Sequence, residues 1–514
     1  MSTAAETNMS AERRADPMLI TGGMGVYISW WKLSRIVSMM GGMGVVSGTG
    51  LEFVHPRILQ QGDKDGNIRR AFAELARRQP ALAPHLQKII DMYYIEGGKA
   101  ARAPYRTVPI MSLRRIPELD AGKNSFWEPE IDHQVLLIAT SFTEVWLAKE
   151  GHNGRVGINF LRKVEKQLPW CLYGAMLAGV DYVVVGAGNP GELPGMIRSL
   201  SRHEHTSLAM KVFGADANTG SFSVTVRPET LTGTGREALP QPKFLAIVSS
   251  FNLAKSLSSN PDTRPYGFVV EGHEAGGHSA PPAKMQFDAQ GNQLLVYTDQ
   301  DNADIPSIAS LGLPFWLAGS YAKPEFLKQA ITHGAAGVQF GTLAACSGQS
   351  GLVPELRTSV LQKISSGMLA VKNSLISPTG FPFKVAQIEG TLSEKSVYES
   401  RKRRCDLALL QVNYVTSDGK LGFRCPAEPV DAFVAKGGRE KNTEGRVCLC
   451  NALLSAAGYA QIRPDGYEEP SVVTLGEDLS SVKELLRGLS AGQDSFTIGK
   501  ALQYIKRGLS ALPG

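Results

Sequence analysis

Cysteine is scarce in this sequence, and long apolar runs are missing. Six cysteines among 514 residues are too few for a disulfide framework. No apolar run approaches the roughly 18–20 residues that a membrane-spanning helix needs. The first residues are polar and lack the apolar segment of a signal peptide. These absences exclude a disulfide-rich secreted protein and a helical membrane protein, and they predict a cytoplasmic protein.

A strong excess of charge is also missing. Lysine and arginine total 54 and aspartate and glutamate total 48, so the formal net charge is only +6. Spread over a chain of this length, that charge does not indicate a nucleic-acid-binding protein. The hydrophobic fraction of 43% is ordinary for a globular protein with a large core. We therefore expect a small-molecule substrate, and no nucleic-acid or membrane partner.

What the sequence does contain is a repeated alternation of short apolar runs and helical stretches. The runs show no polar alternation, which is typical of strands buried on both faces of a parallel sheet. They cover residues 18–20, 44–47, 155–160, 181–185, 244–249, 267–270, 314–318 and 337–340. Pro324 suits the first turn of a helix predicted over 324–331. Eight such units predict an α/β fold, a closed (β/α)8 TIM barrel.

Four segments interrupt this repeat. Alternating patterns predict hairpins at 207–227 and 285–297. The domain organisation that we predict is a polar N-terminal tail at 1–16, a barrel from 17–60 and 150–345, a helix-rich insertion after the second strand at 61–149, and a mostly helical C-terminal extension at 346–514. We expect the extension to cap the barrel or to mediate assembly, which leaves a homo-oligomer open.

The stretch Glu271–His278 directly follows the sixth predicted strand. In a barrel this is the C-terminal face, where active sites lie. Gly276 and Gly277 let the backbone approach a flat ligand closely. His278 follows them and can act as a base or a hydrogen-bond donor near neutral pH. From spacing alone, a structural loop with a solvent-facing histidine is an equally good interpretation.

Metal ligands are the alternative use of these residue types. His273, Glu274 and His278 do not form the zinc-binding pattern His-Glu-x-x-His, because glycines break the helix that it needs. The four cysteines of the extension end in Cys448-Leu449-Cys450, whose single intervening residue is unlike common zinc knuckles. We therefore expect buried thiols and no metal. The four are Cys405, Cys425, Cys448 and Cys450.

Small residues end the last two predicted strands. Gly319-Ser320 follows the seventh strand and Gly341-Thr342 follows the eighth. Barrels often bind phosphate at these positions through backbone N–H groups, and the two hydroxyls add further donors. The alternative is a pair of ordinary tight turns. The sequence 186–191 also satisfies the dinucleotide pattern Gly-x-Gly-x-x-Gly, but no dinucleotide-binding half surrounds it, so we do not expect a Rossmann site.

Four motifs together resemble those of the nitronate monooxygenase family, formerly called 2-nitropropane dioxygenase, which includes FMN-dependent enoyl reductases. They are Gly22-Gly23-Met24-Gly25, Gly157-Ile158-Asn159, Glu271–His278 and Gln339-Phe340-Gly341-Thr342, which follow the order of the family and lie at strand ends. The resemblance covers roughly residues 17–60 and 150–350. It implies a TIM barrel with FMN as cofactor, and is less specific for the substrate.

The resemblance also implies roles for individual residues. His278 would be the catalytic residue beside the flavin. The cofactor-binding residues would be Gly22, Gly23, Met24, Asn159, Glu271, Gly276, Gly277, Gly319, Ser320, Gln339, Phe340, Gly341 and Thr342. Two positions depart from the family, which usually has glutamine at Glu271 and glycine at Ser320. The insertion and the extension also exceed its compact members.

Three hypotheses about function follow. The first is oxidation of alkyl nitronates by O2 to a carbonyl compound and nitrite. The second is NAD(P)H-dependent reduction of an activated alkene such as an enoyl thioester. In both reactions the flavin carries the redox step while the protein orients the substrate and handles a proton. The third is a flavin-binding or assembly protein without catalysis, and the intact Gly276-Gly277-His278 sequence speaks against it.

Overall fold

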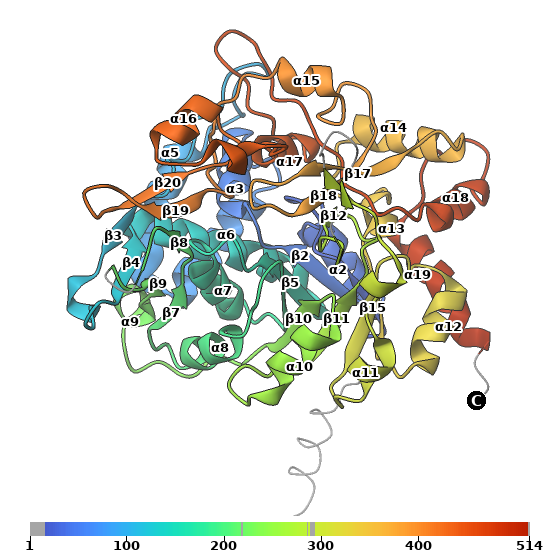
Figure 1. The fold of residues 1–514 in the computed structure, drawn as a ribbon, viewed down its shortest axis with the longest axis horizontal. Coiled ribbons are helices and arrows are strands. Elements are labelled where there is room, and N and C mark those ends of the chain that lie inside the picture. The colour runs from blue at the N-terminus through green and yellow to red at the C-terminus, as the bar shows by residue number, and fades with distance from the viewer. Residues whose placement is uncertain (1–15, 217–218, 285, 288–292, 512–514) are drawn as a thin grey trace, which may run out of the picture.

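In the computed structural model, eight parallel strands close into a barrel (Figure 1). The structure describes residues 16–216, 219–284, 286–287 and 293–511. The barrel strands are β1 (Leu19–Thr21), β2 (Met43–Ser47), β5 (Arg155–Leu161), β6 (Tyr182–Gly186), β10 (Lys243–Val248), β11 (Gly267–Glu271), β15 (Phe315–Ala318) and β16 (Gly337–Phe340). Each corresponds to one of the eight predicted strands. The pairing of β1 with β16 closes the barrel, and the TIM-barrel prediction is confirmed.

Apolar side chains fill the inside of the barrel. Trp316 and Tyr182 are among the largest fully buried side chains, and they share this inner cluster with Met43, Val45 and Leu245. The floor is closed by Asp16, whose carboxylate accepts hydrogen bonds from Tyr182, Lys243 and Tyr266. The barrel is therefore a packed core and not a pore, and ligands must bind at its rim.

Helices surround the barrel between successive strands. They include α2 (Trp31–Met39), α7 (Leu168–Leu177), α8 (Leu193–Ser201), α10 (Phe251–Ser259), α11 (Ile305–Ala309) and α12 (Pro324–Thr332). The predicted helix at 324–331 is confirmed as α12, with Pro324 in its first turn. Among the described residues, no helix is both long and apolar enough to cross a membrane.

Residues 61–149 combine inserted elements with one helix of the barrel wall. The inserted elements are α4 (Asn67–Arg78), α5 (Ala83–Tyr93), β3 (Leu113–Arg115) and β4 (Ser125–Pro129), which follow α3 (Leu51–Gln60). The last helix, α6 (Ile131–Lys149), packs on α2, α7 and β2. It therefore occupies the position of the barrel helix that leads into β5.

Both predicted excursions contain paired strands. In the first, β7 (Thr206–Ala209) pairs antiparallel with β9 (Phe222–Val226), and β8 (Val212–Phe213) lies between them in sequence. In the second, β13 (Gln286–Phe287) pairs with β14 (Gln293–Leu294). The expected turn at residues 290–292 lies outside the described residues, as does nearly all of the predicted N-terminal tail.

The C-terminal extension packs along one side and across the rim of the barrel, where its orange and red elements are visible in Figure 1. Its helices include α14 (Pro354–Ser365), α16 (Val430–Ala435), α17 (Cys450–Ala456), α18 (Ser480–Arg487) and α19 (Ile498–Lys506). It also contains the strands β17 (Val371–Ile376), β18 (Pro382–Ala386), β19 (Val412–Val415) and β20 (Leu421–Arg424), which the sequence did not predict. Through these strands the extension joins β8 and β12 (Gly277–His278), which belong to loops of the barrel.

Candidate functional site

A cavity of about 480 Å³ lies at the C-terminal ends of the barrel strands. All the site residues expected from the sequence lie in its wall, although they come from five different strand ends. They are Gly22, Gly23, Met24, Asn159, Glu271, Gly276, Gly277, His278, Gly319, Ser320, Gln339, Phe340, Gly341 and Thr342. The fold thus brings together segments that are more than 300 positions apart in the sequence.

The loop after β1 forms one wall of the cavity and packs closely against β5. A Cβ atom on Gly23 would lie 2.2 Å from the Cβ of Asn159, so only glycine fits there. Ser29 fixes the loop because its hydroxyl donates to the Gly22 carbonyl at 2.7 Å and accepts from the Met24 N–H at 3.1 Å. This wall is therefore rigid and nearly free of side chains, which suits a flat ring.

Ser320 offers a buried hydroxyl at the end of β15. Its Oγ is buried and has no hydrogen-bond partner, and its φ of 59° lies in the left-handed region that non-glycine residues seldom adopt. Gly319 before it has a φ of 81°. A buried polar atom without a partner is costly unless a ligand satisfies it. These residues fit the phosphate end of FMN.

Thr342 is already engaged by the extension. Its Oγ1 accepts a hydrogen bond from the Gly476 N–H at 2.8 Å. The hydroxyl hydrogen remains able to donate toward the cavity. The sequence offered Thr342 as a free hydroxyl, whereas the structure gives it a second task, which is to hold the 475–476 loop against the barrel.

His278 lies on β12 and not on a free loop. It pairs with Phe383 in β18, and its ring packs edge-on against Phe383 and Phe381 at centroid distances of 4.9 and 6.4 Å. Its Nε2 atom is buried without a hydrogen-bond partner. Burial, and then the charge of Lys163, hold the pKa of His278 well below its usual range. The imidazole is therefore neutral at physiological pH.

Lys163 is a functional-site neighbour that the sequence did not reveal. Its Nζ atom is buried without a hydrogen-bond partner and lies 4.0 Å from the centre of the Phe381 ring. Burial lowers the pKa of Lys163 to about 7. Because it follows β5 within an ordinary run of charged residues, no pattern in the sequence distinguished it. The ring of Phe381 contacts both this amine and the His278 ring.

Glu271 ends β11 and faces the cavity. Burial raises the pKa of Glu271 to about 7, and the charge of Lys384 partly opposes this shift. Lys384 has no exposed side-chain surface, and its Nζ binds the His273 carbonyl and the Glu477 carboxylate at 2.6 Å each. Glu271 can therefore hold or release a proton near neutral pH.

The second histidine of the stretch has different surroundings. The ring of His273 stacks on Tyr297 at a centroid distance of 4.4 Å and an interplanar angle of 10°. Among the described residues, the wall of the cavity includes His278 but not His273. Their positions favour His278 as the histidine that meets a ligand.

Gly276 is small for a reason other than the one expected from the sequence. A Cβ atom there would lie 2.7 Å from the carbonyl carbon of Leu475 and 2.9 Å from the nitrogen of Gly476. The space is thus needed by the extension and not by a flat ligand. Gly277 has a φ of 81° and open space where a Cβ would be. The sequence predicted that the backbone of both glycines approaches a flat ligand, and the structure leaves that role to Gly277 alone.

Two further groups of cavity residues escaped the sequence analysis. One is Gly186–Gly188 at the end of β6, whose glycine pattern belongs to the barrel rim and not to a Rossmann site. The other is an apolar roof from the extension, to which Phe381, Phe383, Leu409, Leu410, Leu453 and Leu475 contribute. Among the described residues of the wall there are carboxylates but no lysine or arginine. The site is therefore suited to uncharged groups.

No family model matches the chain. A curated relative from Mycobacterium tuberculosis is 26% identical over 250 residues, which are 47% of this chain and 63% of the relative. It is named (3aS,4S,5R,7aS)-5-hydroxy-7a-methyl-1-oxo-octahydro-1H-indene-4-carboxyl-CoA dehydrogenase. The chain thus spans less than two thirds of the length of the curated relative that it matches.

Among solved structures, FabK from Thermotoga maritima has a TM-score of 0.45 at 13% identity and covers 99% of this chain and 97% of its own. The enoyl reductase domain of MlnA from Bacillus amyloliquefaciens has a TM-score of 0.46 at 11% identity, covering 99% and 97%. Nitroalkane oxidase from Streptomyces ansochromogenes has a TM-score of 0.42 at 11% identity, covering 97% and 98%. The chain is therefore distantly similar to these proteins, while its strand pairing alone establishes the barrel.

Proposed function

We propose that the chain is an FMN-dependent oxidoreductase that reduces an activated alkene in an uncharged acyl group, such as an enoyl thioester. The observation that carries this proposal is the composition of the cavity wall. The glycine-lined wall of the cavity and the buried Ser320 hydroxyl suit FMN, and the roof of the cavity is apolar. A nitronate is an anion, and it would meet Glu271 there without any cationic side chain among the described wall residues.

The curated relative supports the choice of a thioester. Its name describes a dehydrogenase of a carboxyl-CoA, which is a thioester, and the match covers 250 residues. An acyl chain can occupy the apolar roof while a charged carrier stays outside the cavity. When bound, FMN supplies hydride transfer between NAD(P)H and the substrate carbon.

The residues of this chain then have separable tasks. The loop at Gly22–Met24 orients the ring, and Ser320 holds the phosphate. His278, as a neutral imidazole, can donate a hydrogen bond to the thioester carbonyl and so polarise the alkene. The carboxyl of Glu271, with a pKa raised to about 7 by burial, can hold the proton that the substrate requires. The extension excludes water from above.

Oxidation of a nitro compound is the second candidate, and it is supported by the place of His278 in the cavity wall with its Nε2 atom free of a hydrogen-bond partner. A neutral imidazole in an apolar pocket can remove a proton from a neutral nitroalkane. Burial and the charge of Lys163, which keep the pKa of His278 low, would maintain that state over the physiological range. This reaction would use O2 and not a nicotinamide.

Anaerobic stopped-flow measurement of flavin reduction distinguishes the two candidates. NADH, NADPH and an alkyl nitronate are mixed separately with the flavin-loaded enzyme. Rapid reduction by a nicotinamide, followed by reoxidation with an enoyl thioester, is the result that we expect. Reduction by the nitronate alone would contradict the reductase proposal and support the second candidate.

A further inference from the structure

The extension folds its cysteines toward one another. The first residue of β19 pairs with the last residue of β20, so this hairpin returns Cys425 close to the segment that precedes β19. Within that segment, the main-chain N–H of Leu410 donates a hydrogen bond to the sulfur of Cys450. Cys405 begins the same segment five residues earlier. The register of one hairpin thus brings three cysteines from distant positions to one place.

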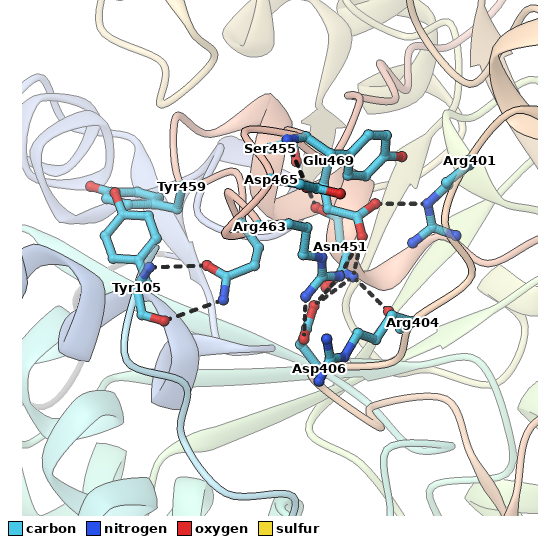
Figure 2. Close-up of polar contacts among 12 residues, drawn as sticks. Tyr105, Arg401, Arg404, Asp406, Asn451, Ser455, Tyr459, Arg463, Asp465 and Glu469 are labelled. Atoms are coloured by element: carbon cyan, nitrogen blue, oxygen red, sulfur yellow. Dashed lines mark hydrogen bonds and ion pairs between the residues drawn. The ribbon is translucent and has the colours of Figure 1, made fainter. Parts of the chain in front are cut away.

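A buried polar network fixes the Cys405 and Cys450 segments relative to each other (Figure 2). The side-chain amide of Asn451 donates to the Arg404 carbonyl at 3.2 Å and to the Asp406 carboxylate at 2.9 Å. Asn451 directly follows Cys450, while Arg404 and Asp406 flank Cys405. The residue after Cys450 is therefore tied to both neighbours of Cys405.

Main-chain N–H groups converge on these sulfurs. The Ala408 N–H donates to the Sγ of Cys405 at 3.3 Å, and the Leu407 N–H also bonds to it. Ala408 has a φ of 54°, which closes the turn around the sulfur. Ala427 follows Cys425 by two residues, and its main-chain N–H bonds to the Cys425 sulfur in the same way. Such N–H groups stabilise a thiolate, which is the form that ligates metals.

Two buried cations border the cysteines. Arg401 has no exposed side-chain surface and pairs through Nε with Glu469 at 2.8 Å. Lys166 is buried as well, with its Nζ atom 4.2 Å from the centre of the Phe423 ring in β20. These cations would offset the negative charge of several thiolates.

A single ion does not fit this arrangement. Within the part of the chain that the structure describes, no three histidine, cysteine or acidic side chains are placed to share one metal ion. An iron–sulfur cluster presents its iron atoms at separate corners, so its four cysteines need not approach a common point. We propose that Cys405, Cys425, Cys448 and Cys450 bind an iron–sulfur cluster. This replaces the expectation, drawn from the Cys-x-Cys spacing, that they are buried thiols without a metal.

The cluster would border the cavity. Cys450 lies in the cavity wall together with Leu409, Leu410 and Leu453. Iron binds cysteine as the thiolate, so binding of the cluster must release protons. The inference does not depend on the proposed reaction, because binding of the cluster is measured without turnover.

The test uses the full chain, purified without oxygen from iron-supplied cells and, where iron is low, reconstituted with ferrous iron and sulfide. Iron, zinc and acid-labile sulfide are measured per chain, and electron paramagnetic resonance spectra are recorded after reduction with dithionite. We expect iron and sulfide in equal amounts, more than one of each per chain, with the spectrum of a reduced cluster. Stoichiometric zinc, or no bound iron after reconstitution, would overturn the proposal.

Substitutions locate the site. Cys425→Ser and Cys448→Ser should each lose most of the iron and sulfide while the FMN content stays that of the wild type. Cys171→Ser, a buried cysteine of α7 outside the extension, is the matched control and should keep both. If iron and sulfide survive in both extension variants, the cluster is bound elsewhere and the assignment is wrong. Should these variants fail to fold, the metal and sulfide content of the wild type still decides.

Discussion

At the residue scale, the candidate catalytic groups are distinguished by their local environment in the fold and not by sequence motifs. The Glu271–His278 stretch contains two histidines, and the sequence chose His278 from its place after the glycines. The structure puts His278 in the cavity wall between aromatic rings, and it stacks His273 on Tyr297. No sequence pattern showed that burial and Lys163 would keep His278 neutral, because both effects arise from residues that meet only in the fold.

His278→Ala should retain FMN and lose about 10²–10⁴ in kcat/KM on a neutral substrate, which is the usual contribution of a positioned acid or base. His273→Ala is the matched control and should cost much less, because it lies outside the described cavity wall. Steady-state kinetics with the flavin content measured in parallel decide this. An inactive His273→Ala beside a normal His278→Ala would mean that the wrong histidine was chosen.

Ser320→Ala should weaken FMN binding, since it removes a buried hydroxyl that has no partner within the protein. A hydrogen bond to a charged phosphate is worth roughly 1.5–3 kcal/mol, so the dissociation constant should rise about tenfold or more. Adding Thr342→Val should weaken binding further. Fluorescence titration of the apoprotein with FMN measures both effects, and an unchanged constant in the double variant would place the phosphate elsewhere.

Glu271→Gln should change how stability depends on pH. Burial raises the pKa of Glu271 from 4.5 to about 7, so the folded state binds a proton that the unfolded state has lost. Its contribution is therefore complete below about pH 4.5 and declines as the pH rises through 7. At high pH the wild type must ionise this buried carboxyl, which lowers its free energy of unfolding, and the glutamine variant does not. Because the carboxyl borders a cavity, this difference should be on the order of 1–3 kcal/mol.

Urea unfolding of the apoprotein at pH 5 and pH 8.5 measures this effect. We expect the glutamine variant to gain stability relative to the wild type at the higher pH but not at the lower one. An equal difference between the two proteins at both values would show that the carboxyl does not titrate in this range.

At the scale of elements, the barrel strands were predictable and the strands of the extension were not. Most barrel strands are buried on both faces, so they appear as apolar runs that end in glycine or another small residue. The strand β12 has only two residues and pairs with β18 more than 100 positions away. So short a segment carries no periodicity, and its partner is set by the tertiary fold.

The contact between the Gly276 loop and residues 475–476 should be sensitive to a single methyl group. In Gly276→Ala the new Cβ would lie 2.7 Å from backbone, and overpacking of this kind typically costs about 1–3 kcal/mol. Gly272→Ala is the matched control in the same loop, because its nearest neighbour would be 3.9 Å away. Thermal unfolding and limited proteolysis of the extension should therefore affect Gly276→Ala alone. Equal behaviour of the two variants would contradict this contact.

At the scale of the whole molecule, the site is assembled from two parts of unequal predictability. The barrel rim supplies the residues that the sequence indicated, because strand ends in a barrel meet at one face. The extension supplies the roof and the second strand beside His278. The sequence predicted that it caps the barrel or mediates assembly, but no pattern identified the residues that line the cavity. The cysteines show the same limit, since their spacing along the chain suggested nothing of the turns that gather them.

The central claim is that this barrel is built to hold FMN, and identification of the bound cofactor tests it most directly. The purified protein should be yellow. Mass spectrometry of the small molecule released by heat should show FMN, near one per chain after reconstitution, because the glycine-lined wall and Ser320 accommodate one flavin phosphate and no adenosine-binding half is present in the described residues. Release of FAD, or no flavin even after incubation with FMN, would contradict the account.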